Sequence, residues 1–224
     1  MTNPIESRIT RRESVLRVGG LLAAALGADG WRWLAASEAS AAPGCVLTPE
    51  QTEGPFYLER SKLRRNIIEG RPGVSLTLNL RVVDASTCKP IKGAVVDIWH
   101  CDADGVYSGA QQAVGRTFLR GIQRTNATGV TMFQTVYPGW YQGRTVHIHV
   151  KVHVGGDVAH TGQLYFPDKL TDVVYRRTPY NTRPGRSMRN ADDGIFGSGG
   201  SRSLLTLRRK GSGYVGAITM GVRR

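Results

Sequence analysis

Apolar and polar residues alternate along most of the chain after residue 74, which is the pattern of half-buried β-strands. The clearest run is VSLTLNLRVVDA, and later runs are GAVVDIWHCDADG, TMFQTVYPGWY, TVHIHVKVHV and the short GQLYFPD, with glycine and proline between them. Near the C-terminus, SLLTLRRKGSGYVGAITMGV predicts two strands joined by a Gly-Ser-Gly turn. No segment of this part has a sustained helical period, and LTDVVYRR is expected to form one short turn at most. Many short strands at this spacing predict an all-β fold, either a sandwich or a barrel.

The first 41 residues follow a different pattern. ITRRESVLRVGGLLAAALGA has a basic start and a short apolar run, and the small residues of Ala39-Ser40-Ala41 follow it. The apolar run is too short to cross a bilayer, so the segment predicts an export signal and not a membrane span. Arg11-Arg12 favours the twin-arginine route, and an ordinary secretory signal is the alternative. The sequence therefore predicts an export signal over residues 1–41, one domain over residues 42–224, and a periplasmic or extracellular protein.

The net charge limits the classes of binding partner, and the cysteine content limits the possible disulfides and metal sites. The formal net charge of +13 favours anionic partners, or simply reflects a solvated arginine-rich surface. The basic residues are scattered, without an RNA-binding signature or a run of five like charges, so no nucleic acid is expected. Three cysteines, Cys45, Cys88 and Cys101, allow one disulfide and one free thiol, with three pairings open. No CxxC pair is present, which argues against a thiolate zinc site.

Two histidines in one predicted strand are the first candidates for a functional site. Side chains alternate between faces of a strand, so His147 and His149 point the same way, with Cα atoms about 6.5 Å apart. At that separation two imidazoles can converge on one metal ion. His153 shares the face but lies about 13 Å from His149 by the same rise. The alternative is a pair of surface histidines.

The remaining ligands of such a site must come from elsewhere in the chain. No glutamate follows Glu69, which excludes the H-E-x-x-H motif and a cupin-like site. Tyr107, in the loop DADGVYSG, and Tyr141, after a Pro-Gly turn, could supply phenolate oxygens, which favour ferric iron. An iron site of two histidines and one carboxylate is the other option. Its carboxylate could come from Asp97, Asp102 or Asp104.

In combination, these motifs resemble the intradiol ring-cleavage dioxygenases, the family of catechol 1,2- and protocatechuate 3,4-dioxygenases. The resemblance runs from about residue 45 to the C-terminus. It is carried by QTEGPFY, GAVVDIWHCDADGVYSG, FLRGIQRTNATGVTMFQTVYPGWYQGRTVHIHVKV and GQLYF. The joint occurrence of G-x-Y, P-G-x-Y, R-x-x-H-x-H and a downstream glutamine is specific, whereas any one of them alone is not.

The resemblance implies a β-sandwich of mixed sheets with long active-site loops. It also implies one non-haem Fe(III), an aromatic diol and O2 as substrates, and a muconate-type dicarboxylic acid as product. The implied iron ligands are Tyr107, Tyr141, His147 and His149. Tyr141 would also act as a base, and Arg144 would stabilise negative charge on the ring. Gln163 falls near the family's active-site glutamine, and Gly54 and Pro55 match an arm that lines the substrate pocket in some members.

Departures from the family pattern refine these expectations. The helical N-terminal domain of the catechol 1,2-dioxygenases is replaced by an export signal, and Trp140 stands where other members have proline. These features resemble an exported single-domain branch of the family. The particular diol and the oligomeric state stay open, and a homodimer is one option. Trp99 and Trp140 are expected to pack and not to react, and His100, His153 and His160 are expected to be surface or loop histidines. A competing hypothesis is an exported β-sandwich module that binds polysaccharide or aromatic ligands without catalysis.

Overall fold

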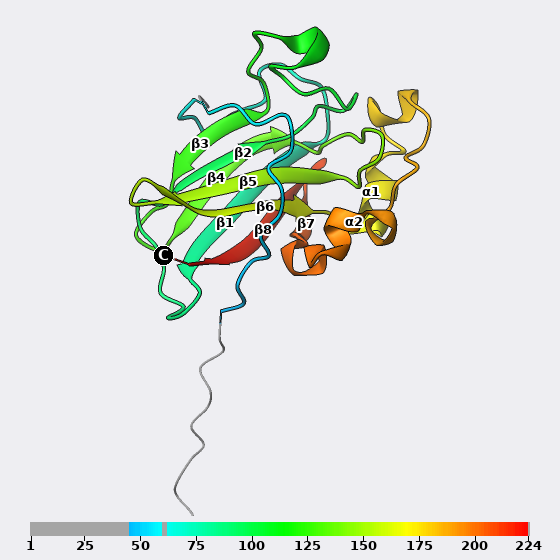
Figure 1. Ribbon diagram of the computed structural model, residues 1–224. Coiled ribbons are helices and arrows are strands. Elements are labelled where there is room, and N and C mark those ends of the chain that lie inside the picture. The colour runs from blue at the N-terminus through cyan, green and yellow to red at the C-terminus, as the bar shows by residue number, and fades with distance from the viewer. Residues whose placement is uncertain (1–44, 60–61, 224) are drawn as a thin grey trace, which may run out of the picture. The chain divides into compact units, whose positions relative to one another are not determined.

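The computed structural model describes residues 45–59 and 62–223 (Figure 1). The predicted export signal over residues 1–41 lies outside the described residues and stays a prediction. No helix among the described residues is long and apolar enough to cross a membrane.

In the described part of the chain, eight strands form two four-stranded sheets. Sheet I has the order β4-β1-β8-β7, and sheet II has the order β3-β2-β5-β6. Sheet I is mixed because β1 and β8 run parallel, whereas all pairs of sheet II are antiparallel. The predicted all-β sandwich is therefore confirmed, with one mixed and one antiparallel sheet. The strands of sheet I are β1 (Ser75–Asp84), β4 (Val130–Val136), β7 (Thr206–Lys210) and β8 (Gly213–Val222), and those of sheet II are β2 (Val95–Trp99), β3 (Arg120–Arg124), β5 (His147–Val154) and β6 (Asp157–Tyr165).

The main core lies between the two sheets. In β1 the alternation seen in the sequence places Leu76, Leu78 and Leu80 inside, fully buried. From sheet II the same cluster receives Ile148 and Val150, among other aliphatic residues. In β5, however, the residues between these are buried too, so both faces of sheet II are covered.

Helical structure is short and gathers mostly between β6 and β7. The helix α1 covers part of LTDVVYRR and makes about two turns, slightly more than the single turn expected from sequence. The short helix α2 begins after Asp193, whose side chain caps it. The helical elements are α1 (Asp168–Val174), α2 (Gly194–Gly197) and the 3-10 turns η2 (Gln111–Ala113), η3 (Tyr180–Thr182), η4 (Asn190–Asp192) and η5 (Gly200–Ser203).

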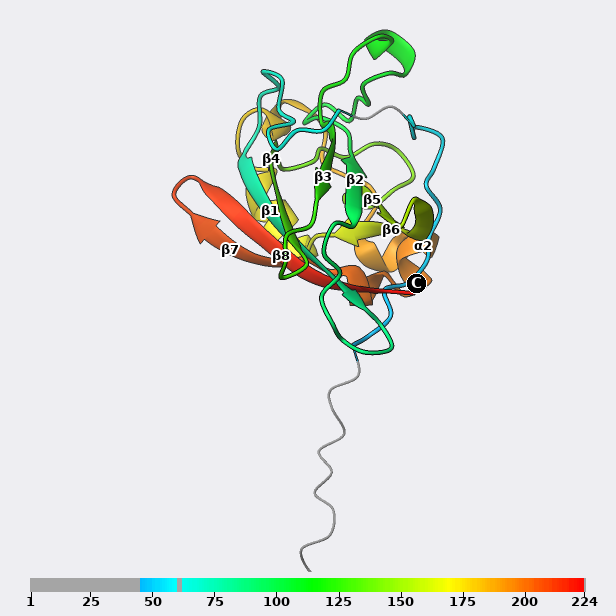
Figure 2. The ribbon, with the colours of Figure 1, turned by 90° about the vertical axis from the view of Figure 1, so that its left-hand side faces the viewer.

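Residues 45–59, hereafter the arm, cover part of the outer face of sheet II. Both ribbon views show the arm passing beside β5 and β6 (Figures 1 and 2). The Gln51 N–H donates to the Thr161 carbonyl over 2.9 Å, and Glu50 pairs with His160 over 2.8 Å. At its start the arm is tied down by a disulfide between Cys45 and Cys88, whose Cα atoms are 5.3 Å apart. This pairing is one of the three that the sequence left open, and Cys101 keeps a buried thiol.

Candidate metal centre

The two histidines of the H-x-H motif open β5 and are deeply buried, with His147 2% and His149 1% exposed. The alternative of surface histidines is therefore wrong. His147 Nδ1 lies 2.7 Å from the Thr145 carbonyl oxygen, which can only accept, so Nδ1 carries the ring proton. Its Nε2 then presents a lone pair, 3.1 Å from His149 Nε2.

Two tyrosines reach the same place from two loops. Tyr107 comes from the β2–β3 loop, is 4% exposed and stacks on Phe56 with ring centroids 4.4 Å apart. Tyr141 comes from the β4–β5 loop, and its hydroxyl lies 3.3 Å from His147 Nε2. The ring centroid of Tyr107 is 5.6 Å from that of Tyr141 and 6.1 Å from that of His149. The structure thus brings together all four side chains that the motifs singled out.

The Tyr107 hydroxyl is buried without a hydrogen bond to another described residue. It lies close enough to Tyr141 for each group to shift the other's pKa, but the pair lacks hydrogen-bond geometry. A buried polar group without a partner is costly unless a water or an ion satisfies it.

Burial sets the protonation of this cluster. It lowers the pKa of His147 to about 3 and that of His149 well below its usual value, so both imidazoles are neutral. It raises the pKa of Tyr107 well above 10, and it also raises the pKa of Tyr141, which Arg144 partly offsets. Two neutral imidazole nitrogens and two phenol oxygens around one point fit a hard cation, which would let the phenols ionise.

The alternative with a carboxylate ligand has no support in the described part of the chain. No group of three or more His, Cys, Asp or Glu side chains there could hold a metal ion. Asp102 is occupied by Arg71 and by the backbone N–H groups of Asp104 and Val106. Asp97 lies opposite Lys151, two residue pairs further along the sheet than the pair of Trp99 and His149.

Arg144 is fixed beside the four rings by two partners. Its Nε donates to Asp193 Oδ2 over 2.9 Å, and its Nη2 donates to Gln163 Oε1 over 2.5 Å. Gln163 is itself held, because its Nε2 donates to the Thr52 carbonyl in the arm and its Oε1 accepts from the Tyr165 hydroxyl. The motif-based placement of Arg144 and Gln163 near the histidines thus matches the geometry.

Asp193 is a residue of this site that the sequence did not indicate. Its Oδ2 also accepts from the Thr145 N–H over 2.8 Å, and its Oδ1 accepts from the N–H groups of Ile195 and Phe196. Burial would raise the pKa of this carboxyl, but hydrogen bonds from Thr145 and Phe196 and the charge of Arg144 lower it overall. It lies 49 residues after Arg144, so only an Asp-Gly helix start marks it in the sequence.

The arm closes one side of the site. Gly54 has a φ of +69°, and a Cβ added there would lie 3.2 Å from His149 Cε1, so both backbone and space favour glycine. Pro55 follows it and is exposed. Tyr57 packs on Trp99, with ring centroids 4.8 Å apart, and Trp99 stacks on His149 at 4.9 Å and an interplanar angle of 3°. Trp99 therefore packs, as expected.

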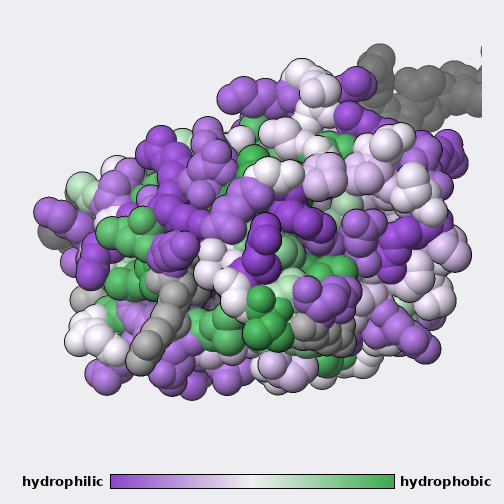
Figure 3. Space-filling model, turned by 90° about the horizontal axis from the view of Figure 1, so that it is seen from above, coloured by the Kyte–Doolittle hydropathy of each residue, from purple (hydrophilic) through white to green (hydrophobic). Residues whose placement is uncertain are grey.

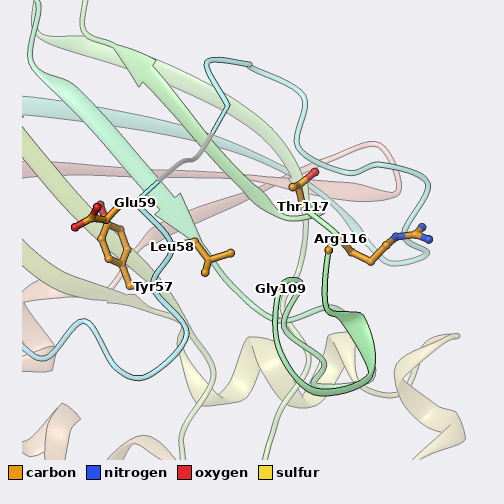
Figure 4. A pocket seen from close by; sticks show the side chains of 7 residues that line it. Tyr57, Leu58, Glu59, Gly109, Arg116 and Thr117 are labelled. Carbon is orange, nitrogen blue, oxygen red and sulfur yellow. The ribbon is translucent and has the colours of Figure 1, made fainter.

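A cavity of about 220 Å³ adjoins the two tyrosines. It is lined by Phe56, Gly105, Tyr107, Ala110, Tyr141 and Gln142, none of which is charged. A larger pocket of about 550 Å³ lies between the arm and the β2–β3 loop but contains none of the four rings (Figure 4). Seen from above, hydrophobic residues reach the surface as separate patches among hydrophilic ones (Figure 3).

His100 lies in the loop after β2, as expected, although it is not at the surface, whereas His160 corrects the expectation of a surface or loop position. His100 is fully buried between the Cys101 carbonyl and the Thr135 hydroxyl, and burial lowers its pKa to about 4. His160 is 1% exposed and lies under Glu50 of the arm. His153 is half-buried. The expectation was wrong for His160 because the arm covers a part of β6 that the strand pattern alone leaves open.

Comparison with known proteins agrees with this fold. The family model described as Dioxygenase matches residues 52–176, which is more than half of the chain. The chain therefore belongs to the intradiol ring-cleavage dioxygenase family, as the motifs predicted.

Solved structures and curated relatives show how far the similarity extends. An intradiol ring-cleavage dioxygenase from Tetranychus urticae is 39% identical, with a TM-score of 0.76 over 80% of this chain and 95% of that chain. The dioxygenase domain of a dioxygenase and carbohydrate-binding protein fusion from Streptomyces sp. SirexAA-E is 33% identical, with a TM-score of 0.62 over 80% and 99%. Catechol 1,2-dioxygenase 2 from Acinetobacter lwoffii is 34% identical over 135 residues, which are 56% of this chain and 49% of that protein. The chain spans about half the length of the curated relatives it matches.

Proposed function

We propose that the protein is a non-haem Fe(III) dioxygenase that opens the ring of a catechol-type aromatic diol with O2, giving a muconate-type dicarboxylic acid. The observation that carries the proposal is the buried cluster of two imidazoles and two phenols, with the two Nε2 atoms 3.1 Å apart and the Tyr107 hydroxyl unsatisfied. Tyr107, Tyr141, His147 and His149 would hold the ferric ion, which when bound supplies Lewis-acid activation of the diol.

The cavity beside the tyrosines is the place for the diol. Phe56 and Ala110 offer apolar contact to an aromatic ring, and the cavity adjoins both Tyr107 and Tyr141. Tyr141 is half-buried, whereas Tyr107 is packed under Phe56. With the ferric ion bound Tyr141 would be ionised, so its phenolate Oη would take a proton from a substrate hydroxyl and become a neutral phenol, while Tyr107 would stay in place.

Arg144 supplies positive charge to the same space. Asp193 and Gln163 fix its guanidinium before substrate arrives, so the charge needs no reorganisation during the reaction. It stabilises the negative charge of the deprotonated diol and of the carboxylates that form. The arm, with Gly54 against His149, excludes water from that side.

The test is the colour and the oxygen uptake of the purified protein. Phenolate bound to ferric iron gives a visible charge-transfer band, so protein reconstituted with Fe(III) should be reddish and should consume O2 with a panel of catechols. Product identification then separates ring opening from simple oxidation. Protein that stays colourless and inactive after reconstitution would overturn the proposal and support the non-catalytic binding module.

We also propose that residues 1–41 export the protein through the twin-arginine route. Changing Arg11 and Arg12 together to lysine should leave the protein in the cytoplasm, as measured by cell fractionation. Unchanged export would point to the ordinary secretory route. A homodimer stays a prediction, which light scattering of the purified protein would check.

A further inference from the structure

Arg120 is a buried arginine that the proposed reaction does not use. It opens β3 and is 3% exposed. Its Nε donates to the Ser108 carbonyl over 3.1 Å and to Ser108 Oγ over 2.9 Å, and its Nη2 donates to the same carbonyl over 2.6 Å. All three hydrogen bonds go to one residue, the one that directly follows Tyr107.

The contact closes the loop that carries Tyr107. Ser108 Oγ, which accepts from Arg120, donates in turn to the Phe118 carbonyl over 2.6 Å. Residues 109–117 lie between these two anchor points, and Gly105 and Gly109 on either side of Tyr107 have φ values of +80° and +76°. Glycine loses more conformational freedom on folding than any other residue, so the contacts at Ser108 contribute to ordering the loop and to the orientation of Tyr107.

Burying this guanidinium costs free energy, which its hydrogen bonds offset only in part. Its Nη1 is buried and makes no hydrogen bond to another described residue. A charge removed from water in this way is costly. The forked pair of N–H groups that grips the Ser108 carbonyl is a geometry that lysine cannot reproduce.

The register of sheet II links this contact to the histidines. Arg120 pairs with Trp99, Trp99 pairs with His149, and His149 pairs with Gln163. These four residues form one row across four strands, on the face that carries the site. The row therefore connects the Tyr107 loop at one end with the partner of Arg144 at the other.

We propose that Arg120 is a positioning residue, which sets the place of Tyr107 relative to His149 by holding both the carbonyl and the Oγ of Ser108. This inference rests on the proposed function, because it assigns Tyr107 to the iron. It predicts that Arg120 governs how long iron is retained and how the Tyr107 phenolate is oriented, without touching substrate itself.

The test compares Arg120→Lys with Arg64→Lys. Arg64 is a matched control because it holds the same strand end through the Arg120 and Thr117 carbonyls, without contacting Ser108. Both variants should lose similar thermal stability. In Arg120→Lys alone, iron should pass to a chelator about 10–100-fold faster, the range found when groups that orient ligands are changed. Its visible band should also shift or weaken.

Three outcomes separate this inference from the proposed function. Wild-type protein that takes up no ferric iron overturns the proposed function. Wild-type protein that binds iron, with equal iron loss in both variants, overturns the role of Arg120 alone. Should Arg120→Lys fail to fold, Ser108→Ala removes the Oγ contacts to Arg120 and Phe118 and should release iron several-fold faster, and an unchanged rate overturns the role.

Discussion

The two sheets of this sandwich are built alike but buried differently. In sheet I, β1 alternates between buried leucines and exposed or half-buried polar residues such as Ser75 and Arg81. In sheet II, the first six residues of β5 are all buried, because the arm and the β2–β3 loop cover the outer face. Sheet I thus has one buried face and one face open to solvent along β1, whereas sheet II is buried on both faces along β5.

This difference in burial shows where a β-sandwich can hold a buried polar site. The face of sheet II toward sheet I is aliphatic, with Ile148 and Val150 in the main core. Its other face carries His147, His149 and Gln163, removed from water by segments without regular structure. Polar groups in such a place change their pKa and interact strongly with charge. The aliphatic face of sheet II thus supports a polar face that is removed from water.

Replacing His149 with alanine should have the largest effect on the polar face. The change removes one of the two facing Nε2 atoms and the ring that stacks on Trp99. Oxygen uptake with catechol should fall by more than the ~100-fold seen when only a supporting group is lost. Iron content per chain should fall with it, while the circular-dichroism spectrum keeps its β-sheet form. Retained iron and activity would show that the polar face is not the reactive one.

The two tyrosines should differ when each is changed to phenylalanine. Tyr107→Phe removes the more deeply buried oxygen and should mainly lower iron content, by about 10-fold or more. Tyr141→Phe should keep more iron but bind catechol more slowly, because the proton acceptor is gone. Metal analysis and stopped-flow mixing with catechol measure the two effects. Equal iron loss with unchanged binding kinetics would contradict the distinct roles.

Much of this organisation could be predicted from the sequence, because the strands and the four candidate ligand side chains have local signatures. Period-2 alternation marks β1, and the combination of G-x-Y, P-G-x-Y and R-x-x-H-x-H marks four side chains that the fold brings together. The burial of His100 and His160 could not be predicted in this way, since it depends on segments packed over the sheet. Nor could Asp193, whose contact with Arg144 spans 49 residues, or the choice of Cys88 as the partner of Cys45.

A change on the aliphatic face of the same strand should separate stability from chemistry. Ile148 lies between the two histidines but points into the main core and is fully buried. Ile148→Ala should lower the free energy of unfolding by about 2–5 kcal/mol through lost burial and a residual cavity. The folded fraction should keep kcat within about threefold, because no reactive group is altered. Urea denaturation measures the change in stability, steady-state kinetics measures kcat, and metal analysis measures the iron content. A loss of iron equal to that of His149→Ala would show that the two faces of β5 are not independent.

The smallest effect is expected where the arm meets the site, at Gly54. Its φ of +69° makes any side chain unfavourable, by roughly 1 kcal/mol for alanine. Gly70 offers a matched control, since its φ is +74° but a Cβ there would meet nothing within 4 Å. Gly54→Ala and Gly70→Ala should therefore lose similar stability in thermal unfolding. Only Gly54→Ala places a methyl group 3.2 Å from His149 Cε1, so only this variant should raise the KM for catechol several-fold and shift the visible band. Equal kinetics in the two variants would mean that the arm covers sheet II without affecting the geometry of the site. The proposed activity would then depend only on the strands and the loops that carry the two tyrosines.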